Sequence, residues 1–149
     1  MTRLAVAVSA EGVRSPVAAR RLGAAAELVL RAEGVREAMV SIALVSRTRM
    51  AALNAAHLGH RGATDVIAFA FTRAGGAPVL GDVYISPEIA RANARRHGVA
   101  VREEVMRLVV HGVLHVLGYA HPRGGGRERS AMWHRQEALL ARALRSAAA

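Results

Sequence analysis

The stretch HGVLHVLGYAH, residues 111–121, carries three of the chain's seven histidines in an otherwise apolar segment. It continues VREEVMRLVV, residues 101–110, which is apolar on nearly every face after Glu104. Because a helix that is apolar all round is typically buried, these residues predict a central helix over 101–117. His111 and His115 are four residues apart, so their rings leave the same face of that helix about one turn apart.

Two interpretations of the three imidazoles have to be compared. One histidine on an apolar helix is more often a hydrogen-bonded core residue than a metal ligand. Three of them at this spacing are hard to bury without partners, and Gly118 can end the helix in the left-handed conformation, which brings His121 back over the same face. We therefore predict a metal site with an open coordination position, formed by His111, His115 and His121. Zinc is the first choice, although nickel or copper suits the same ligands.

Gly112 bears on both the chemistry and the packing of this helix. In zinc peptidases with a His-Glu-x-x-His helix, this position holds the glutamate that acts as general base. A glycine there leaves the ordinary peptidase mechanism without its base. A glycine inside a helix also costs about 1 kcal/mol relative to alanine. We therefore expect a strand or a substrate to pack closely against Gly112.

The composition excludes several kinds of chemistry. The 149 residues suit one compact domain, which we expect to span 1–149. The absence of cysteine removes disulfides, thiolate nucleophiles and cysteine-ligated zinc sites. All 21 basic residues are arginine, which excludes Schiff-base lysines and a phosphate-loop lysine.

The net charge of +10 favours an anionic partner such as nucleic acid. With only two Phe, two Tyr and one Trp, the chain has few rings on which bases could stack. If RNA is the partner, we expect it to be contacted mainly through its phosphates and shape. No apolar run approaches the roughly 18 residues of a membrane span, and the N-terminal segment alternates like a strand rather than a signal peptide, so we expect a cytoplasmic protein.

The order of predicted elements indicates an α+β fold with a mixed sheet and helices packed around the central metal-binding helix. A first helix is expected to have Ser15 as its N-cap, Pro16 at its first position and Gly34 as its stop. The remaining expected elements are strands at 3–9 and 39–46, a short helix ending near Gly59, an antiparallel hairpin of 64–71 and 81–86, a helix from Ser86 to Gly98, and a C-terminal helix at about 131–144.

Several arginines are candidates for RNA contact. Three fall on neighbouring turns of the helix that ends at Gly98 and form a basic face, for which a solvated surface is the default interpretation. Arg107 lies one turn before His111 and either neutralises phosphate or pairs with Glu103 or Glu104. The full set of candidates is Arg61, Arg91, Arg95, Arg96, Arg107 and Arg123. The two aspartates, Asp65 and Asp82, open the strands of the hairpin, and neither is a secure general base.

The block RLVVHGVLHVLGYAH, residues 107–121, is similar to the signature of the YbeY family, bacterial rRNA maturation factors described as metal-dependent, single-strand-specific endoribonucleases. Residues 53–71, 80–86 and 132–137 resemble its other blocks in the same order. The resemblance implies a zincin-like fold and one zinc ion per chain on His111, His115 and His121. It also implies a cytoplasmic role in rRNA processing and small-subunit maturation, with rRNA and small-subunit ribosomal proteins as partners.

Two positions depart from the family pattern. Ala120 stands where the family usually has an aspartate that could orient a metal ligand or a bound water. Leu58 stands where many members have an arginine suited to phosphate, and Arg61 is a nearby candidate to replace it. Both departures imply weaker metal binding or lower activity than in members that keep the polar residues.

Three functions follow from these observations, and they belong to different classes. The leading hypothesis is a metal-dependent endoribonuclease acting in rRNA processing. The alternative is a non-catalytic, metal-stabilised ribosome-assembly factor that binds rRNA through its arginine-rich surface, which the missing aspartate and arginine favour. A small zinc peptidase is disfavoured by Gly112 and the basic surface.

Overall fold

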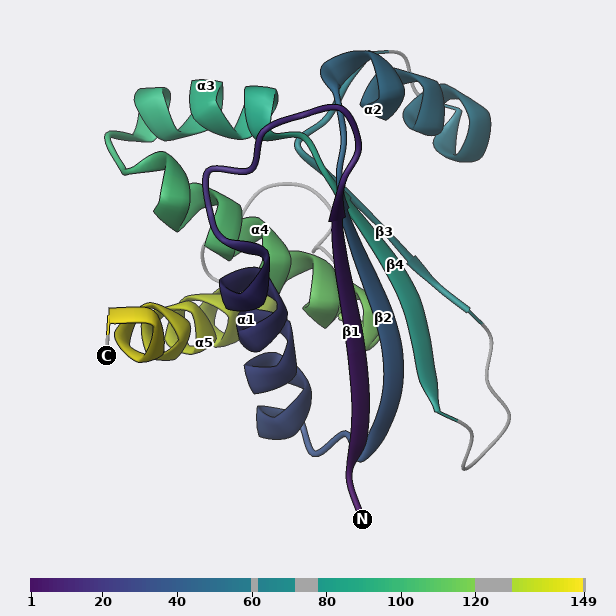
Figure 1. The fold of residues 1–149 in the computed structure, drawn as a ribbon, viewed down its shortest axis with the longest axis vertical. Helices are drawn as coiled ribbons and strands as arrows, with labels where there is room; N and C mark the ends of the chain where they lie inside the picture. The colour runs from purple at the N-terminus through teal and green to yellow at the C-terminus, as the bar shows by residue number, and fades with distance from the viewer. Residues whose placement is uncertain (60–61, 72–77, 120–129, 149) are drawn as a thin grey trace.

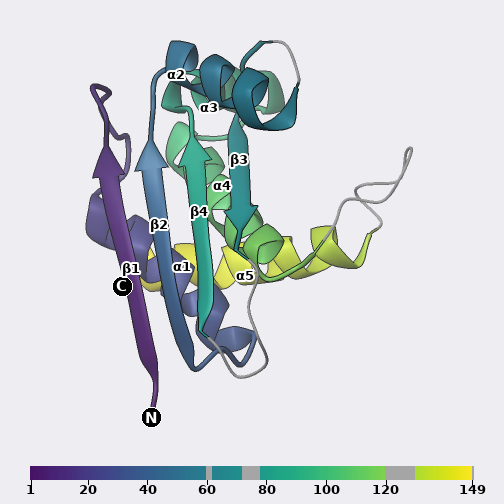
Figure 2. The ribbon, with the colours of Figure 1, turned by 90° about the vertical axis from the view of Figure 1, so that its right-hand side faces the viewer.

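Four strands form one mixed sheet in a computed structural model that describes residues 1–59, 62–71, 78–119 and 130–148. In spatial order they are β1 (Arg3–Ala10), β2 (Glu37–Leu44), β4 (Val79–Ile85) and β3 (Val66–Ala70), as Figure 1 and Figure 2 show. β1, β2 and β4 are parallel, and β3 pairs antiparallel with β4 at the sheet edge. The predicted α+β class with a mixed sheet is confirmed.

The helices divide into two groups around this sheet. Three of them lie on one side of the sheet: α1 (Ala19–Ala32) and α4 (Val101–Val116) pack on the strands, and α5 (Ala131–Ala148) packs on these two helices. α2 (Arg47–Leu53), which continues into the π-helical turn η1 (Asn54–Leu58), and α3 (Pro87–His97) lie at the end of the sheet where the parallel strands finish (Figure 2). In the described part of the chain, no helix is both long and apolar enough to span a membrane.

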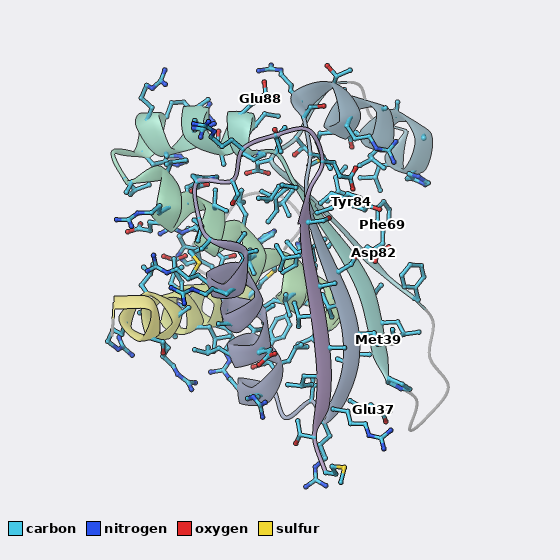
Figure 3. All side chains as sticks on the ribbon, in the orientation of Figure 1. Glu37, Met39, Phe69, Asp82, Tyr84 and Glu88 are labelled. Atoms are coloured by element: carbon cyan, nitrogen blue, oxygen red, sulfur yellow. The ribbon has the colours of Figure 1, made fainter. Side chains whose placement is uncertain are left out.

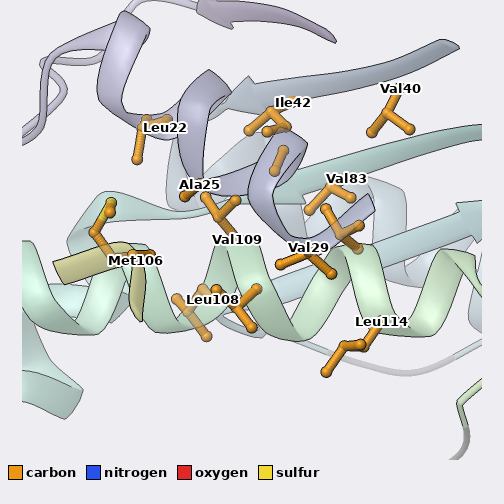
Figure 4. Packing of buried hydrophobic residues seen from close by; sticks show 14 of the residues in the cluster. Leu22, Ala25, Val29, Val40, Ile42, Val83, Met106, Leu108, Val109 and Leu114 are labelled. Atoms are coloured by element: carbon orange, nitrogen blue, oxygen red, sulfur yellow. The ribbon is translucent and has the colours of Figure 1, made fainter. Parts of the chain in front are cut away.

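α4 lies in the middle of the main core, as its sequence predicts. Its residues Val105, Val109 and Val113 are completely buried. Figure 4 shows Val109 facing both α1, through residues such as Val29, and the sheet. Burial on several sides explains why this helix is apolar all round, and the expected central helix is confirmed over 101–116.

Two glycines allow α4 to approach β4 closely. A Cβ atom built on Gly112 would lie 2.5 Å from a methyl carbon of Val83, and one on Gly81 would lie 2.4 Å from a methyl carbon of Val116. Each glycine therefore receives the valine of the opposite element, and any side chain at either position would collide. The predicted close packing against Gly112 is confirmed, and its partner is a strand.

The start of α1 differs from the prediction. The helix begins after Ala18, three residues beyond the expected N-cap at Ser15. Ser15 instead binds locally: its hydroxyl donates to the carbonyl of Val17 and accepts from the N–H of the same residue. Because serine hydroxyls can bond their own neighbouring backbone, a Ser-Pro pair is compatible with a turn as well as with a helix cap. The same pair does cap α3, where Ser86 accepts from the N–H of Ile89.

The opposite face of the sheet carries a smaller apolar cluster beneath α2. Figure 3 shows Met39, Phe69, Asp82 and Tyr84 on this side. Successive residues of a strand face opposite sides of a sheet, so Asp82 points away from α4 while its neighbour Val83 packs on it. The carboxylate of Asp82 accepts from the Ser41 hydroxyl at 2.6 Å. Asp82 is therefore separated from the histidines by the sheet.

Replacing Gly112 by alanine should lower the free energy of unfolding by up to about 2 kcal/mol. Overpacking a tight contact costs about 1–3 kcal/mol, and the 2.5 Å approach to Val83 places this site in the upper part of that range, above the roughly 1 kcal/mol that alanine gains in helix propensity. Gly23→Ala is the matched control in α1, because its new Cβ would lie 3.7 Å from a Val8 methyl, an ordinary contact. Chemical denaturation should show Gly23→Ala equal to or more stable than wild type. Equal effects of the two changes would contradict the close approach of α4.

Candidate functional site

A cavity of about 870 Å³ lies between α4 and the edge strand β3. The first turns of α5 and the last turn of α3 complete its wall. His111 and His115 both line this cavity, so the structure brings the predicted pair of imidazoles to one open space. Their ring centroids are 4.5 Å apart and the ring planes are inclined at 76°. We call this space the histidine cavity.

The end of α4 orients the ring of His115. The N–H of Gly118 donates to the carbonyl of His115 at 2.9 Å, and the N–H of Tyr119 donates to Leu114 at 3.0 Å, which is the pattern of a Schellman cap. Gly118 adopts φ 105°, as this turn requires. The turn brings the carbonyl oxygen of Tyr119 to 2.8 Å from Nδ1 of His115. A carbonyl only accepts, so Nδ1 of His115 is the protonated nitrogen.

Gln136, from α5, orients the ring of His111. Its Oε1 lies 2.6 Å from Nδ1 of His111, while its Nε2 donates to Glu137 at 3.0 Å. The carboxylate fixes which end of the amide is the acceptor, so Nδ1 of His111 is also the donor. Gln136 is only 2% exposed, and both ends of its amide are bonded. Such a buried, satisfied amide holds its partner in one orientation.

These hydrogen bonds place the lone pair of each ring on Nε2, the atom that would bind a metal. A protonated Nδ1 bonded to a carbonyl or amide oxygen is the usual arrangement of metal-binding histidines. The third predicted ligand, His121, lies outside the described residues. Within 1–59, 62–71, 78–119 and 130–148, no group of three His, Asp or Glu side chains could hold an ion. The described pair therefore fits two of the three predicted positions.

Tyr119 is itself anchored at the C-terminal end of α1. Its hydroxyl donates to Glu33 at 2.6 Å, and the same carboxylate accepts from Arg135 at 2.7 Å. Burial of Glu33 alone would raise its pKa, but the hydrogen bonds from Tyr119 and Arg135 outweigh it and lower the pKa. The pKa of Tyr119 is raised, first by its hydrogen bond to this carboxylate. The anchor fixes the residue whose carbonyl orients His115.

Arg107 is paired with carboxylates, which is the second of its two predicted roles. It donates to Glu103 and Glu104 at 3.0 Å, and to both oxygens of Glu137 at 3.0 and 3.2 Å. Partial burial would lower its pKa, but these three partners outweigh burial and raise it. For Glu137 burial raises the pKa, and Arg107 with Gln136 lowers it below its usual value. Through Glu137, this cluster supports the amide that holds His111.

The other predicted arginines fall in different places. Arg96 lines the histidine cavity, whereas Arg91 and Arg95 are exposed on α3 and are not part of its wall. Arg61 and Arg123 lie outside the described residues, as does Ala120. Leu58, on η1, does line the cavity and is 46% exposed.

The two predicted aspartates also lie in different places. Asp65 lines the histidine cavity at the start of β3, whereas Asp82 lies on the far face of the sheet. Gly112 packs on Val83, so a base at this position would point into the core rather than into the cavity. The cavity thus offers nothing at position 112 for peptidase chemistry.

Among the residues that line the cavity without having been predicted are Asn93, Trp133 and Gln136. Gln136 and Trp133 belong to the block at 132–137 that resembles the family, which was the available signal for them. Asn93 carried no such signal, because an asparagine on a basic helix face resembles any solvated residue.

The fold and the cavity define an α+β protein in which a buried helix presents two oriented imidazoles beside the edge strand of a mixed sheet. The family model described as Endoribonuclease YbeY matches residues 10–144, and the chain belongs to this family. A relative named Endoribonuclease YbeY from Anaeromyxobacter sp. (strain Fw109-5) is 43% identical over 141 residues, which cover 94% of this chain and 72% of the relative. One of the same name from Aquifex aeolicus (strain VF5) is 39% identical over 105 residues, covering 70% of each chain.

A solved structure shares the fold. The solution structure of TM1509 from Thermotoga maritima superposes with a TM-score of 0.63 at 23% identity, covering 95% of this chain and 90% of that one. The α+β arrangement with its mixed sheet is thus found in an independently determined structure.

Replacing Glu33 by glutamine should make stability less sensitive to acid. Because the folded state lowers the pKa of Glu33, its ionised form stabilises the fold above the ordinary pKa of 4.5, and this contribution is lost as the pH falls below that value. Glu33→Gln should be less stable than wild type at pH 7 and lose less stability on acidification, as measured by denaturation at several pH values. Glu27→Gln, on the exposed pair with Arg31, is the control and should follow wild type. Parallel acid slopes for Glu33→Gln and wild type would contradict the proposed stabilisation.

Proposed function

We propose that this protein is a zinc-dependent endoribonuclease that cleaves single-stranded RNA during rRNA processing and small-subunit maturation in the cytoplasm. The observation that carries the proposal is the pair His111 and His115, both oriented through Nδ1 and both lining one cavity. Membership in a family whose members are named endoribonucleases supports RNA as the substrate. Small-subunit rRNA and ribosomal proteins are the proposed partners.

The proposed metal ligands are His111, His115 and His121, with one ion per chain. A bound zinc ion supplies Lewis-acid polarisation of a phosphoryl oxygen. The protein's own contribution is orientation: Gln136 and the carbonyl of Tyr119 hold the two described rings in the tautomer that a metal requires.

RNA recognition is proposed to rest on charge rather than on stacking. The net charge of +10 attracts the phosphate backbone, and its effect on affinity should fall as salt rises. Asp65 is in the cavity, but it already accepts a hydrogen bond from Asn93 at 3.1 Å, and we assign it no role as a base.

A second candidate function is favoured by Leu58. This apolar residue occupies the cavity wall at a position where the family resemblance implies an arginine for phosphate. A chain with weakened chemistry could still bind rRNA as a metal-stabilised assembly factor. Both functions require binding of rRNA, but only the endoribonuclease cleaves it.

The purified protein should contain about one transition-metal ion per chain, and His115→Ala should lose it. Two imidazoles hold an ion far less well than three. Gln136→Ala should retain the site but weaken it about tenfold or more, because His111 loses its orienting acceptor. Elemental analysis and competition with a chelator measure both effects.

The matched control for metal content is His134→Ala. His134 is exposed on α5 and does not line the histidine cavity, so its removal should leave metal content unchanged. Equal metal content in His115→Ala and wild type would exclude the proposed site.

Single-stranded RNA should be cleaved slowly, with activity abolished by a chelator, restored by zinc and absent in His111→Ala. Leu58→Arg should raise the rate if a cation in this wall neutralises phosphate charge. The assay follows a labelled oligonucleotide on a gel, with casein as the control substrate for peptidase activity. Intact RNA that is nevertheless bound by metal-loaded protein would favour the assembly factor.

A further inference from the structure

We infer that Arg96 binds a phosphodiester of single-stranded RNA at the α3 end of the histidine cavity, and that Asn93 and Asp65 position it. This inference rests on the proposed function only in taking RNA as the ligand. It adds a subsite of defined chemistry, remote in sequence from the histidines.

A relay of hydrogen bonds connects the guanidinium of Arg96 to Asp65. The Nδ2 of Asn93 donates to Asp65 at 3.1 Å, and the Oδ1 of Asn93 accepts from Nη2 of Arg96. The carboxylate determines the orientation of the amide, because only Nδ2 can donate to it. Asp65 is held in turn by its backbone, whose carbonyl accepts from the N–H of Ser86 at 3.0 Å. All three side chains of the relay line the cavity.

Two of the described arginines, Arg96 and Arg107, line the cavity, and their surroundings differ in charge. Arg107 is surrounded by three carboxylates, so its cluster carries a net negative charge and repels phosphate. In the described part of the chain, no carboxylate forms an ion pair with Arg96. Its acceptor is a neutral amide, and the carboxylate of the relay, Asp65, bonds to Asn93 rather than to Arg96. Among the described residues of this wall, Arg96 is therefore the cation suited to an anionic backbone.

A comparison with Arg95 distinguishes phosphate binding by Arg96 from a purely structural role of this residue. Both arginines lie in the last turn of α3, where positive charge is favourable to the helix. Both are exposed, and removing either changes the net charge equally. Only Arg96 lines the cavity and bonds to Asn93. Arg95→Ala is therefore the matched control.

The test compares RNA affinity among variants of the full chain. Binding of a labelled single-stranded oligonucleotide is followed by anisotropy, with its intactness checked on a gel. Trp133, the only tryptophan, lines the same cavity and reports occupancy through its emission. Arg96→Ala should weaken affinity about tenfold and reduce the logarithmic salt slope by about 0.7, as expected for one phosphate contact on a single strand. Arg95→Ala should weaken it about twofold or less, and Arg96→Lys should restore part of the loss.

Asn93→Ala tests the positioning step. If Asn93 acts only through Arg96, its removal should weaken binding in wild type and have no further effect in Arg96→Ala. Additive losses, or equal effects of Arg96→Ala and Arg95→Ala, would overturn the inference. RNA that is bound with the expected Arg96 dependence but never cleaved would support the subsite while refuting the endoribonuclease. If wild type cleaves RNA but Arg96→Ala and Arg95→Ala bind it equally well, the endoribonuclease would be supported and the Arg96 subsite refuted.

Discussion

The close contact of α4 with β4 determines how the histidines are presented. Gly112 and Val116 are four residues apart, so they form one stripe of α4, and this stripe packs on Val83 and Gly81. His111 and His115 form the adjacent stripe, rotated by one residue or about 100°. When Gly112 and Val116 pack on β4, His111 and His115 must therefore face the cavity beside β3. A rotation of the helix would bring another side chain into the space that Val83 fills beside Gly112.

A buried helix can carry polar groups only if each of them has a partner. The guanidinium of Arg107 and the ring of His111 both have partners on α5. Glu137 pairs with Arg107, and its neighbour in sequence, Gln136, pairs with His111. The amide of Gln136 also donates to Glu137, which joins the two pairs into one network. Because an unpaired buried polar group costs about 1–3 kcal/mol, this shared network fixes the position of α5 as well as the ring of His111.

Local patterns were sufficient to predict most of the fold and the two described histidines. The apolar run after Glu104 and the four-residue spacing of His111 and His115 depend on helix geometry alone. The start of α1 was predicted wrongly, because Ser15 bonds to its own neighbours instead of capping a helix. The partners of the site were also missed: Glu137 reaches Arg107 across 30 positions and Gln136 reaches His111 across 25. Contacts of that separation depend on tertiary packing, which hydrophobic periodicity does not encode.

The two orienting contacts also differ in how far apart their partners lie in the sequence. Tyr119 is four residues after His115, so that contact lies within the turn that ends α4. Gln136 follows His111 by 25 residues, so the other ring is set only when α5 has docked. The two rings therefore depend on tertiary packing to different extents. Detachment of α5 would remove the acceptor of His111, whereas the acceptor of His115 belongs to the turn that ends α4.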